Sequence, residues 1–439
     1  MSFKSLNIVP ELLKAVQESG YTKPTPIQLK AIPEILNGKD ILAAAQTGTG
    51  KTAGFTLPML QLLKQGKPAR SNQARALILT PTRELAEQVS QSVATYAKHL
   101  NISNLCVYGG VNINPQMLKL RKGIDVLIAT PGRLLDLMQR NCVSFPNLEF
   151  LVLDEADRML DMGFLPDIKR VMKALPEKRQ TLLFSATFSD EIRALANGLL
   201  DNPVSVSVDT NNSTAASVKQ WFHPVDKKRK SALISYLIGH HQWAQVLIFV
   251  RTKRGANKVS YDLQKNGIHA EAIHGDKSQG ARTRVLREFK SGKLQALVAT
   301  DIAARGLDIN HLPLVINHDL PHVAEDYVHR IGRTGRAGKT GHAISLVSAD
   351  EIDLLSGVEG LINKRIKRVY VDDFEPSHEV PESRPKAPPK KKPHKKKLAR
   401  LKDKNAKANP NANRSRRKPA NKDKARSNNR NQSNSNRGR

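Results

Sequence analysis

ILAAAQTGTGKT, residues 41–52, joins a short apolar run to a glycine-rich turn that ends in Gly-Lys-Thr. The turn satisfies the phosphate-loop pattern G-x-x-x-x-G-K-[ST] only if Ala45 takes the first glycine position, so it is a variant of that loop. Its glycines would let successive backbone N–H groups face a phosphate, beside the positive end of the following helix. We expect Lys51 to reach the β- and γ-phosphates of a nucleoside triphosphate and Thr52 to hold Mg²⁺. The alternative is a glycine-rich turn without a ligand.

Continuous apolar runs extend outward from this loop and predict buried strands. In the first half of the chain they are ILAAA (41–45), ALILT (76–80), DVLIAT (125–130), FLVLD (150–154) and TLLFSAT (181–187). After a polar stretch at 209–217 a second series follows: QVLIFV (245–250), LQALVATD (294–301), PLVINHDL (313–320) and HAISLVS (342–348). Runs unbroken in Val, Ile and Leu are typical of parallel strands covered on both faces. With amphipathic helical segments between them, they predict two tandem α/β domains joined by a linker.

Charge is concentrated at the C-terminal end of the chain. The net charge is +31, and residues 381–439 hold 22 Lys and Arg against 3 Asp and Glu, or +19. These residues contain no aromatic side chain and only two leucines, so we predict a disordered basic tail from residue 377. A basic excess of this size implies a polyanionic partner: nucleic acid, an anionic membrane surface or an acidic protein.

The number of cysteines and the length of the apolar runs indicate in which cellular compartment the protein is expected. The 439 residues include two cysteines, Cys106 and Cys142, too few for a disulfide framework or a four-cysteine zinc site. The N-terminus does not resemble a secretory signal, and no apolar run approaches the roughly 18 residues that span a bilayer. We therefore expect a soluble, cytoplasmic protein.

Two adjacent carboxylates end another predicted strand, in VLDEAD (152–157). In a protein with a phosphate loop, an acid at the end of a neighbouring strand completes the magnesium site. Asp154 is the candidate for Mg²⁺, and Glu155 is placed to orient or deprotonate the water that attacks the γ-phosphate. Taken alone, such an acidic cluster is usually a solvated loop.

Further short motifs lie at strand ends or helix starts of the first domain: PTRELA (81–86), GG (109–110), TPGR (130–133) and SAT (185–187). Each is uninformative by itself, and Arg83 and Arg133 could equally be structural. Because the carboxyl ends of parallel strands share one sheet edge, together they form a plausible track for a phosphate backbone.

The second domain has no phosphate loop of its own. Charged and glycine-containing stretches nevertheless occur at its strand ends: HGDKSQGAR (274–282), ATDIAARGLD (299–308) and HRIGRTGR (329–336). We infer a two-part site in which Arg333 and Arg336 approach ATP as arginine fingers, an effect of about 10³–10⁵ in rate. The alternative is a basic surface loop that binds nucleic acid directly.

In order and spacing, these motifs resemble those of the DEAD-box RNA helicases of superfamily 2, over roughly residues 1–370. FKSL (3–6), GYTKPTPIQ (20–28), DEADRMLDMGF (154–164) and HGDKSQGARTR (274–284) look most like the bacterial RhlE group. The resemblance implies an ATP hydrolase with two RecA-like domains that uses ATP and Mg²⁺. It also implies RNA-stimulated hydrolysis that unwinds short duplexes or remodels RNA–protein particles, in ribosome assembly or RNA turnover.

The resemblance also implies domain bounds and residue roles. The regions are 1–30 (Q motif), 31–208 (ATP-binding domain), 209–217 (linker), 218–376 (C-terminal helicase domain) and 377–439 (tail). The nucleotide would contact Tyr21, Gln28, Gln46, Thr47, Gly48, Thr49, Gly50, Lys51, Thr52 and Asp308, with Phe3 supporting the adenine pocket. Catalysis would involve Lys51, Asp154, Glu155, Arg333 and Arg336, and coupling to strand separation Ser185, Thr187, Asp157 and His329. RNA would contact Arg83, Gly110, Thr130, Arg133, Arg282, Thr300 and Gly306.

Two rival functions stay open. RNA binding or annealing could be the main role, with ATP setting the residence time. A DNA helicase is also compatible, because backbone contacts do not report the 2′-hydroxyl. We expect a monomer without a membrane contact, and ribosomal precursor particles or RNA-decay enzymes as partners.

Overall fold

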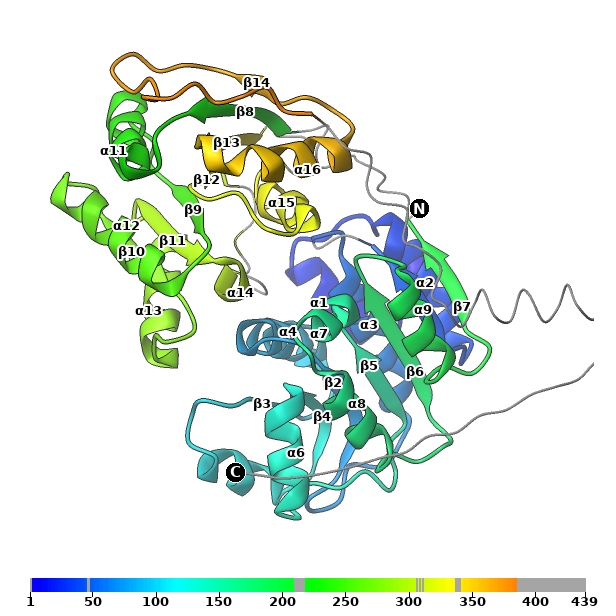
Figure 1. Ribbon diagram of the computed structural model, residues 1–439. Helices are drawn as coiled ribbons and strands as arrows, with labels where there is room; N and C mark the ends of the chain where they lie inside the picture. The colour runs from blue at the N-terminus through cyan, green and yellow to red at the C-terminus, as the bar shows by residue number, and fades with distance from the viewer. Residues whose placement is uncertain are drawn as a thin grey trace, which may run out of the picture. The chain divides into compact units, whose positions relative to one another are not determined.

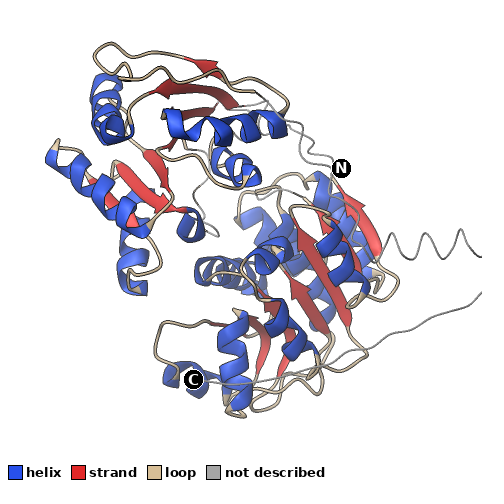
Figure 2. Ribbon diagram, in the orientation of Figure 1, coloured by secondary structure: helices blue, strands red, loops and turns tan. Residues whose placement is uncertain are grey.

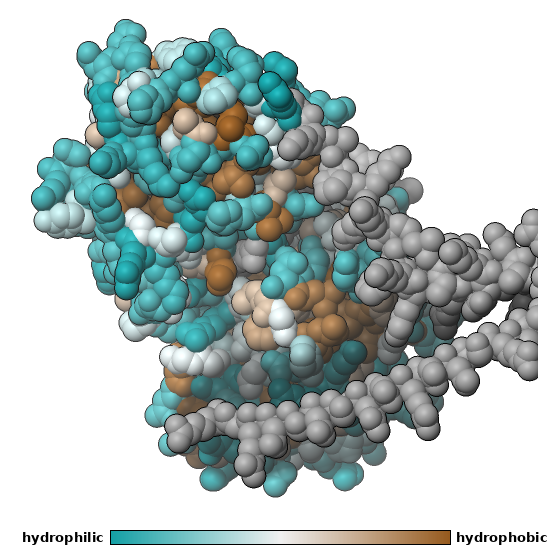
Figure 3. All heavy atoms as spheres, in the orientation of Figure 1, coloured by the Kyte–Doolittle hydropathy of each residue, from teal (hydrophilic) through white to brown (hydrophobic). Residues whose placement is uncertain are grey.

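The structure, a computed structural model, describes residues 2–45, 48–208, 218–304, 307, 309, 312–335 and 341–384 (Figure 1). None of the helices in these ranges is long and apolar enough to cross a membrane. The face drawn in Figure 3 is mostly hydrophilic, with hydrophobic patches among the polar residues. The predicted linker at 209–217 and the chain beyond residue 384 lie outside the described residues.

A seven-stranded parallel sheet forms the first domain, in the order β3-β4-β2-β5-β6-β1-β7. Its strands are β1 (Ile41–Ala44), β2 (Ala74–Leu79), β3 (Asn104–Val107), β4 (Ile124–Ala129), β5 (Phe150–Leu153), β6 (Gln180–Ser185) and β7 (Val204–Ser207). Their register pairs Ala44 with Ser185, and Leu79 with both Ala129 and Leu153. The carboxyl ends of β1, β2, β4, β5 and β6, which precede the predicted motifs, therefore share one edge of the sheet.

Helices cover both faces of this sheet (Figure 2). They are η1 (Phe3–Leu6), α1 (Pro10–Glu18), α2 (Pro26–Leu36), α3 (Lys51–Leu63), α4 (Arg83–Tyr96), η2 (Ala97–His99), α5 (Asn114–Leu120), α6 (Pro131–Gln139), α7 (Ala156–Asp161), α8 (Leu165–Met172) and α9 (Asp190–Asn197). Successive strand residues alternate between two cores: Val152 packs with α1–α4, whereas Leu151 and Leu153 pack with α6–α9. Burial on both faces explains why these strands are continuous apolar runs.

The second domain repeats this architecture, with strand order β10-β11-β9-β12-β13-β8-β14 and parallel pairing throughout the described strands. Its strands are β8 (Val218–Pro224), β9 (Val246–Val250), β10 (Ala270–Ile273), β11 (Ala296–Thr300), β12 (Leu314–Asn317), β13 (Gly341–Val347) and β14 (Lys367–Arg368). Its helices are η3 (Lys227–Arg229), α11 (Lys230–His241), α12 (Lys253–Lys265), α13 (Gln279–Lys290), α14 (Asp301–Ala304), α15 (Ala324–Ile331), η4 (Ala349–Glu351) and α16 (Ile352–Ile362). Two tandem parallel-sheet α/β domains are thus confirmed.

A C-terminal strap, residues 367–384, packs on the second domain after α16. Its strand β14 pairs with β8, and the Val369 N–H donates to Phe222 O (2.9 Å). Further along, Val380 is 1% exposed in the core beside α15 and α16, and the Ser383 hydroxyl donates to the buried Glu359 carboxylate. The packed chain therefore extends to residue 384, past the boundary at residue 376 that sequence analysis predicts. The sequence does not reveal this packing, because the apolar anchor, Val380, lies within an otherwise polar stretch.

Candidate active site

The glycine-rich loop turns between β1 and α3 as the sequence predicts, with Gly48 (φ +79°) and Gly50 (φ +90°) in the left-handed region. Lys51 begins α3 and is 6% exposed, and its ammonium group has no hydrogen-bond partner within the described residues. A buried, unpaired ammonium is costly, and a phosphate anion would compensate its charge. Thr49 is half-buried, as is Thr52 in the first turn of α3. Gln46 and Thr47 lie outside the described residues.

Gln28 connects the upstream segment to this loop. Its carboxamide accepts from the Thr25 N–H (2.9 Å) and donates to Gly50 O (2.9 Å), while Thr25 and Gln28 also form the capping box of α2. A side chain at position 50 would collide with this amide. The Gln28 carboxamide still has a second N–H and a second oxygen lone pair, and the predicted contact with a base edge would use these. Tyr21 is 51% exposed, so part of its side chain is open to solvent.

Buried Phe3 lies in η1 and belongs to the same hydrophobic core as α2 and α3. It thus supports the first domain from the N-terminal side. Sequence reasoning missed Thr25, whose role depends on a tertiary contact with the loop.

Asp154 and Glu155 are both buried, which removes the reading of this acidic cluster as a solvated loop. Asp154 is 2% exposed and accepts from the Glu155 N–H (3.0 Å). Burial raises the pKa of the Asp154 carboxyl to about 6, an effect that Lys51 opposes and that Glu155 and Asp157 reinforce. Glu155 has a left-handed backbone (φ +52°, ψ +51°), an uncommon conformation for a non-glycine residue that occurs at functional sites.

The oxygen donors here suit Mg²⁺, which prefers one or two carboxylates together with phosphate oxygens and water. Asp154 and the Thr52 hydroxyl are such donors. No group of three or more His, Cys, Asp or Glu able to hold a metal occurs in the described part of the chain. The residues therefore fit a magnesium ion that arrives with a nucleotide rather than one held by a protein cage.

Asp157 joins the acidic motif to the SAT segment of the neighbouring strand. Its carboxylate accepts from the Ala186 N–H (3.2 Å), and its second oxygen is buried without a hydrogen-bond partner in the described chain. Ser185 is fully buried and accepts from the Thr187 N–H (3.3 Å). Three of the predicted coupling residues therefore lie together in the first domain, whereas His329 lies on α15 of the second.

Two arginines of the first domain hold the glycine loop that follows β3. Arg83 begins α4 and lies so close to Gly110 (φ +78°) that a side chain there would collide with the guanidinium group. Arg133 donates to Val111 O (3.0 Å), and its Nε and Nη1 are buried without a hydrogen-bond partner among the described residues. Burial lowers the pKa of Arg133. Thr130 follows β4 and occupies the N-cap position of α6 without a capping hydrogen bond from its side chain. Arg133 therefore combines a structural contact with donors that make no hydrogen bond in the described chain.

In the second domain, Thr300 ends β11, Arg282 lies in the first turn of α13, and Arg333 follows α15. The Arg333 Nη1 donates to Leu307 O (2.7 Å). Gly306, Asp308 and Arg336 lie outside the described residues, so their predicted roles stay predictions.

Sequence reasoning missed the role of Arg330, the first arginine of HRIGRTGR, which is 2% exposed. Its guanidinium forms two contacts with Asp301 (2.6 and 2.7 Å), donates to Asn317 Oδ1 (3.1 Å) and Asp319 O (2.6 Å), and lies over the Phe249 ring. Arg330 thus connects the end of α15 with the start of α14 and the ends of β9 and β12.

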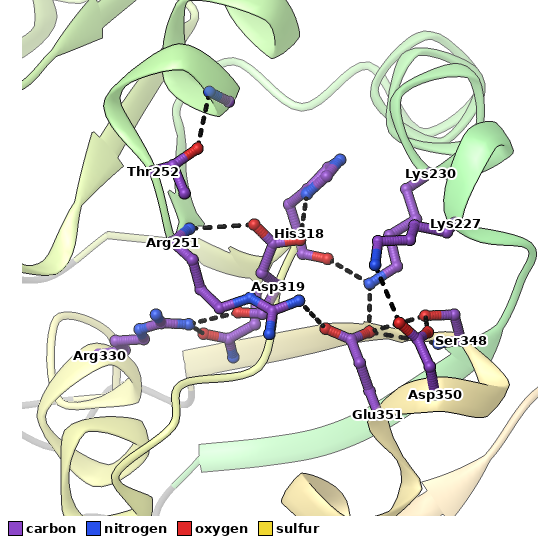
Figure 4. A network of polar contacts seen from close by, with 12 residues as sticks. Lys227, Lys230, Arg251, Thr252, His318, Asp319, Arg330, Ser348, Asp350 and Glu351 are labelled. Atoms are coloured by element: carbon purple, nitrogen blue, oxygen red, sulfur yellow. Dashed lines mark hydrogen bonds and ion pairs between the residues drawn. The ribbon is translucent and has the colours of Figure 1, made fainter. Parts of the chain in front are cut away.

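Figure 4 shows a polar network that continues from this arginine. Asp319 accepts from the Arg251 N–H (3.0 Å), and Glu351 accepts from the Arg251 guanidinium (3.0 Å) and the buried Lys230 ammonium. Burial opposes ionisation of Asp319, but the hydrogen bond from His318 and other contacts leave its pKa lowered. This network fixes the carboxyl edge of the second sheet.

Two family models match the chain: DEAD/DEAH box helicase over residues 25–195 and helicase conserved C-terminal domain over residues 228–338. ATP-dependent RNA helicase CshA of Listeria monocytogenes is 45% identical over 83% of this chain and 69% of its own length. ATP-dependent RNA helicase DeaD of Buchnera aphidicola is 42% identical over 84% of this chain and 61% of its own length. The solved structure of S. cerevisiae Dbp5 bound to RNA and ADP BeF3 has a TM-score of 0.76 at 34% identity, covering 85% of this chain and 96% of that chain.

Proposed function

Because this chain belongs to the DEAD-box ATP-dependent RNA helicases, which are ATP-hydrolysing enzymes, we propose that RNA-stimulated ATP hydrolysis drives local unwinding of short RNA duplexes or remodelling of RNA–protein particles. The observation that carries the proposal is the buried Lys51 ammonium, which has no hydrogen-bond partner among the described residues, at the edge where buried Asp154 and Glu155 also lie. RNA is the proposed polyanion, in keeping with the RNA in the Dbp5 structure.

The residues divide the chemistry among them. Lys51 and the loop N–H groups would hold the β- and γ-phosphates, and Thr52 and Asp154 would hold Mg²⁺. When bound, the ion supplies positive charge against the phosphate oxygens. Glu155 would orient the attacking water and accept its proton. Arg333 and Arg336 would stabilise the negative charge on the γ-phosphoryl group, and Arg282, Thr300 and Gly306 would continue the RNA contacts of the first domain.

ATP and RNA together would favour a closed arrangement that completes the site and bends one RNA strand, with product release reopening it. The chain would act as a cytoplasmic monomer. By resemblance we also propose that the chain is related to the RhlE group. We further propose a role in ribosome assembly or RNA turnover, with precursor particles or decay enzymes as partners. RNA annealing with ATP setting the residence time is a second candidate, favoured by the +19 charge of residues 381–439.

The test compares ATP turnover by the full chain with and without single-stranded RNA, and with DNA of the same sequence. We expect RNA to stimulate turnover and DNA to do so poorly. Equal rates with and without RNA would refute the coupling. Equal stimulation by DNA would instead refute the choice of RNA while leaving the ATPase assignment intact.

A further inference from the structure

A cavity of about 1020 Å³ opens at the amino-terminal edge of the first sheet. Ala74, Phe150 and Gln180, the first residues of β2, β5 and β6, line it together with the loops that precede these strands. The acidic motif and the SAT segment lie at the carboxyl ends of β5 and β6. In parallel strands these are opposite edges, so the cavity is separate from the site described above.

Basic side chains dominate the charge of this cavity. Lys67, Arg70 and Lys178 are exposed and form no ion pair or side-chain hydrogen bond with any other described residue. The carboxylate of Glu149, the one acidic side chain among the described lining residues, accepts from Arg75 Nε (2.7 Å). Three cations therefore face the cavity without a counter-charge.

A fourth cation, Arg179, is half-buried and incompletely satisfied. Its Nη1 donates to Pro176 O (2.5 Å), but its Nε is buried and has no hydrogen-bond partner in the described chain. Burial lowers the pKa of Arg179, and the charge of Asp40 only partly opposes this. The two Asp40 oxygens already accept from the N–H groups of Thr181 (2.7 Å) and Asp201 (2.8 Å). Unsatisfied buried donors are rare in folded proteins and call for an explanation such as a bound anion.

The rest of the lining is largely apolar, including Pro68, Pro146, Pro176 and Leu148. We propose that this cavity binds a small molecule carrying several phosphate groups, either an inorganic polyphosphate or the polyphosphate part of a nucleotide. The volume lies at the upper end of the range for small-molecule sites. The only aromatic residue among the described lining residues, Phe150, is buried, so the cavity lacks the open rings on which single-stranded RNA bases stack.

Lysine footprinting on the full chain tests the proposal at each position separately. The protein is acylated with a succinimidyl ester, with tripolyphosphate, GTP, single-stranded RNA or no ligand, and modified peptides are quantified by mass spectrometry. We expect tripolyphosphate or GTP, at about ten times Kd, to slow modification of Lys67 and Lys178 about tenfold, since about nine sites in ten are then filled. Lys14 and Lys122, exposed and outside the cavity, are the controls and should be unchanged.

Arg179→Gln should abolish protection of Lys67 and Lys178 while leaving protection of Lys51 in the phosphate loop. If this variant does not fold, Lys67→Gln keeps Lys178 as the reporter and should weaken its protection. Protection by tripolyphosphate identifies the phosphates as sufficient, and protection by GTP alone identifies a nucleotide. Protection by RNA alone, equal protection of the control lysines, or no protection by any phosphate ligand would overturn the proposal.

Discussion

At the scale of single residues, Asp154 and Glu155 are neighbours with different surroundings. Asp154 follows β5 and interacts electrostatically with Lys51, whereas Glu155 takes the left-handed turn that begins α7. A sequence can show that two carboxylates follow an apolar run, but not that both are buried. Their different surroundings, with Lys51 beside Asp154 and a left-handed backbone at Glu155, favour a metal-binding role for the first and a general-base role for the second.

Replacing Glu155 tests the second role. Glu155→Gln keeps the size of the side chain but removes the carboxylate that accepts a proton, so we expect ATP turnover to fall about 10²–10⁴-fold. ATP-dependent retention of RNA should persist, because the loop and the RNA contacts are untouched. Turnover and the RNA dissociation rate are the measurements, and exposed Glu177→Gln is the control. Normal hydrolysis by Glu155→Gln would show that the assignment is wrong.

Cys106 should react slowly with thiol reagents in the folded protein. Burial, aided by the charge of Glu87, raises the pKa of the Cys106 thiol to about 12. Because the thiolate is the nucleophile, iodoacetamide should modify Cys106 of the folded protein very slowly at pH 8 and faster only as the pH approaches that pKa. Unfolding in urea should restore ordinary reactivity, as measured by mass spectrometry. Fast modification of Cys106 in the folded state would contradict the raised pKa of this thiol.

The same shift has a consequence for stability. An unfolded thiol loses its proton near pH 8.5, whereas folded Cys106 keeps it. The contribution of Cys106 to the free energy of unfolding is therefore present at lower pH and falls as the pH rises from about 8.5 toward 12.

At the scale of elements, the strands that sequence analysis predicted differ from those that it missed in their position within the sheets. Every predicted run corresponds to a strand inside its sheet, where both faces are buried. The missed strands β3, β7, β10 and β14 are the sheet edges, and β8 lies next to β14. An edge strand has one hydrogen-bonded neighbour and tolerates polar residues, as in VSVS of β7. Its apolar signal is therefore weak.

For the candidate site, too, some features were predictable from the sequence and others were not. Parallel topology places motifs that follow strands at one edge, so their gathering was predictable. Contacts between remote segments, such as Gln28 with Gly50 or Arg330 with Asp301, require the folded chain and left no pattern in the sequence.

The strap offers a prediction at this scale. Val380→Ala removes two buried methyl groups, so we expect the second domain to lose about 2 kcal/mol of unfolding free energy. Both tryptophans of the chain, Trp221 and Trp243, lie in this domain, and their fluorescence during urea unfolding provides the measurement. Val323→Ala, at a position 54% exposed, should change stability by no more than about 0.5 kcal/mol. Equal effects of the two substitutions would argue against docking of the strap.

At the scale of the whole molecule, positive charge is concentrated at the C-terminal end of the sequence, away from the predicted catalytic residues. Catalysis and retention of RNA can therefore be tested separately. Residues 385–439 hold 21 Lys and Arg against 2 Asp and Glu, or +19. The strap is described as far as residue 384, where the Arg384 N–H donates to Ser356, so we expect a cut after it to remove the charge and keep the contacts of the second core. The two candidate functions differ in how much RNA affinity depends on this segment.

Deleting residues 385–439 should weaken RNA binding while RNA-stimulated ATP turnover persists. For single strands the logarithm of the binding constant falls with the logarithm of salt concentration by about 0.7 for each phosphate contact, so losing the segment should flatten that dependence. Binding titrations at several salt concentrations measure it. A full-length variant with the Lys and Arg of 385–439 replaced by Gln separates charge from chain length and should match the deletion. An unchanged salt dependence would mean that the folded domains alone supply the RNA contacts, and the annealing role would lose its support.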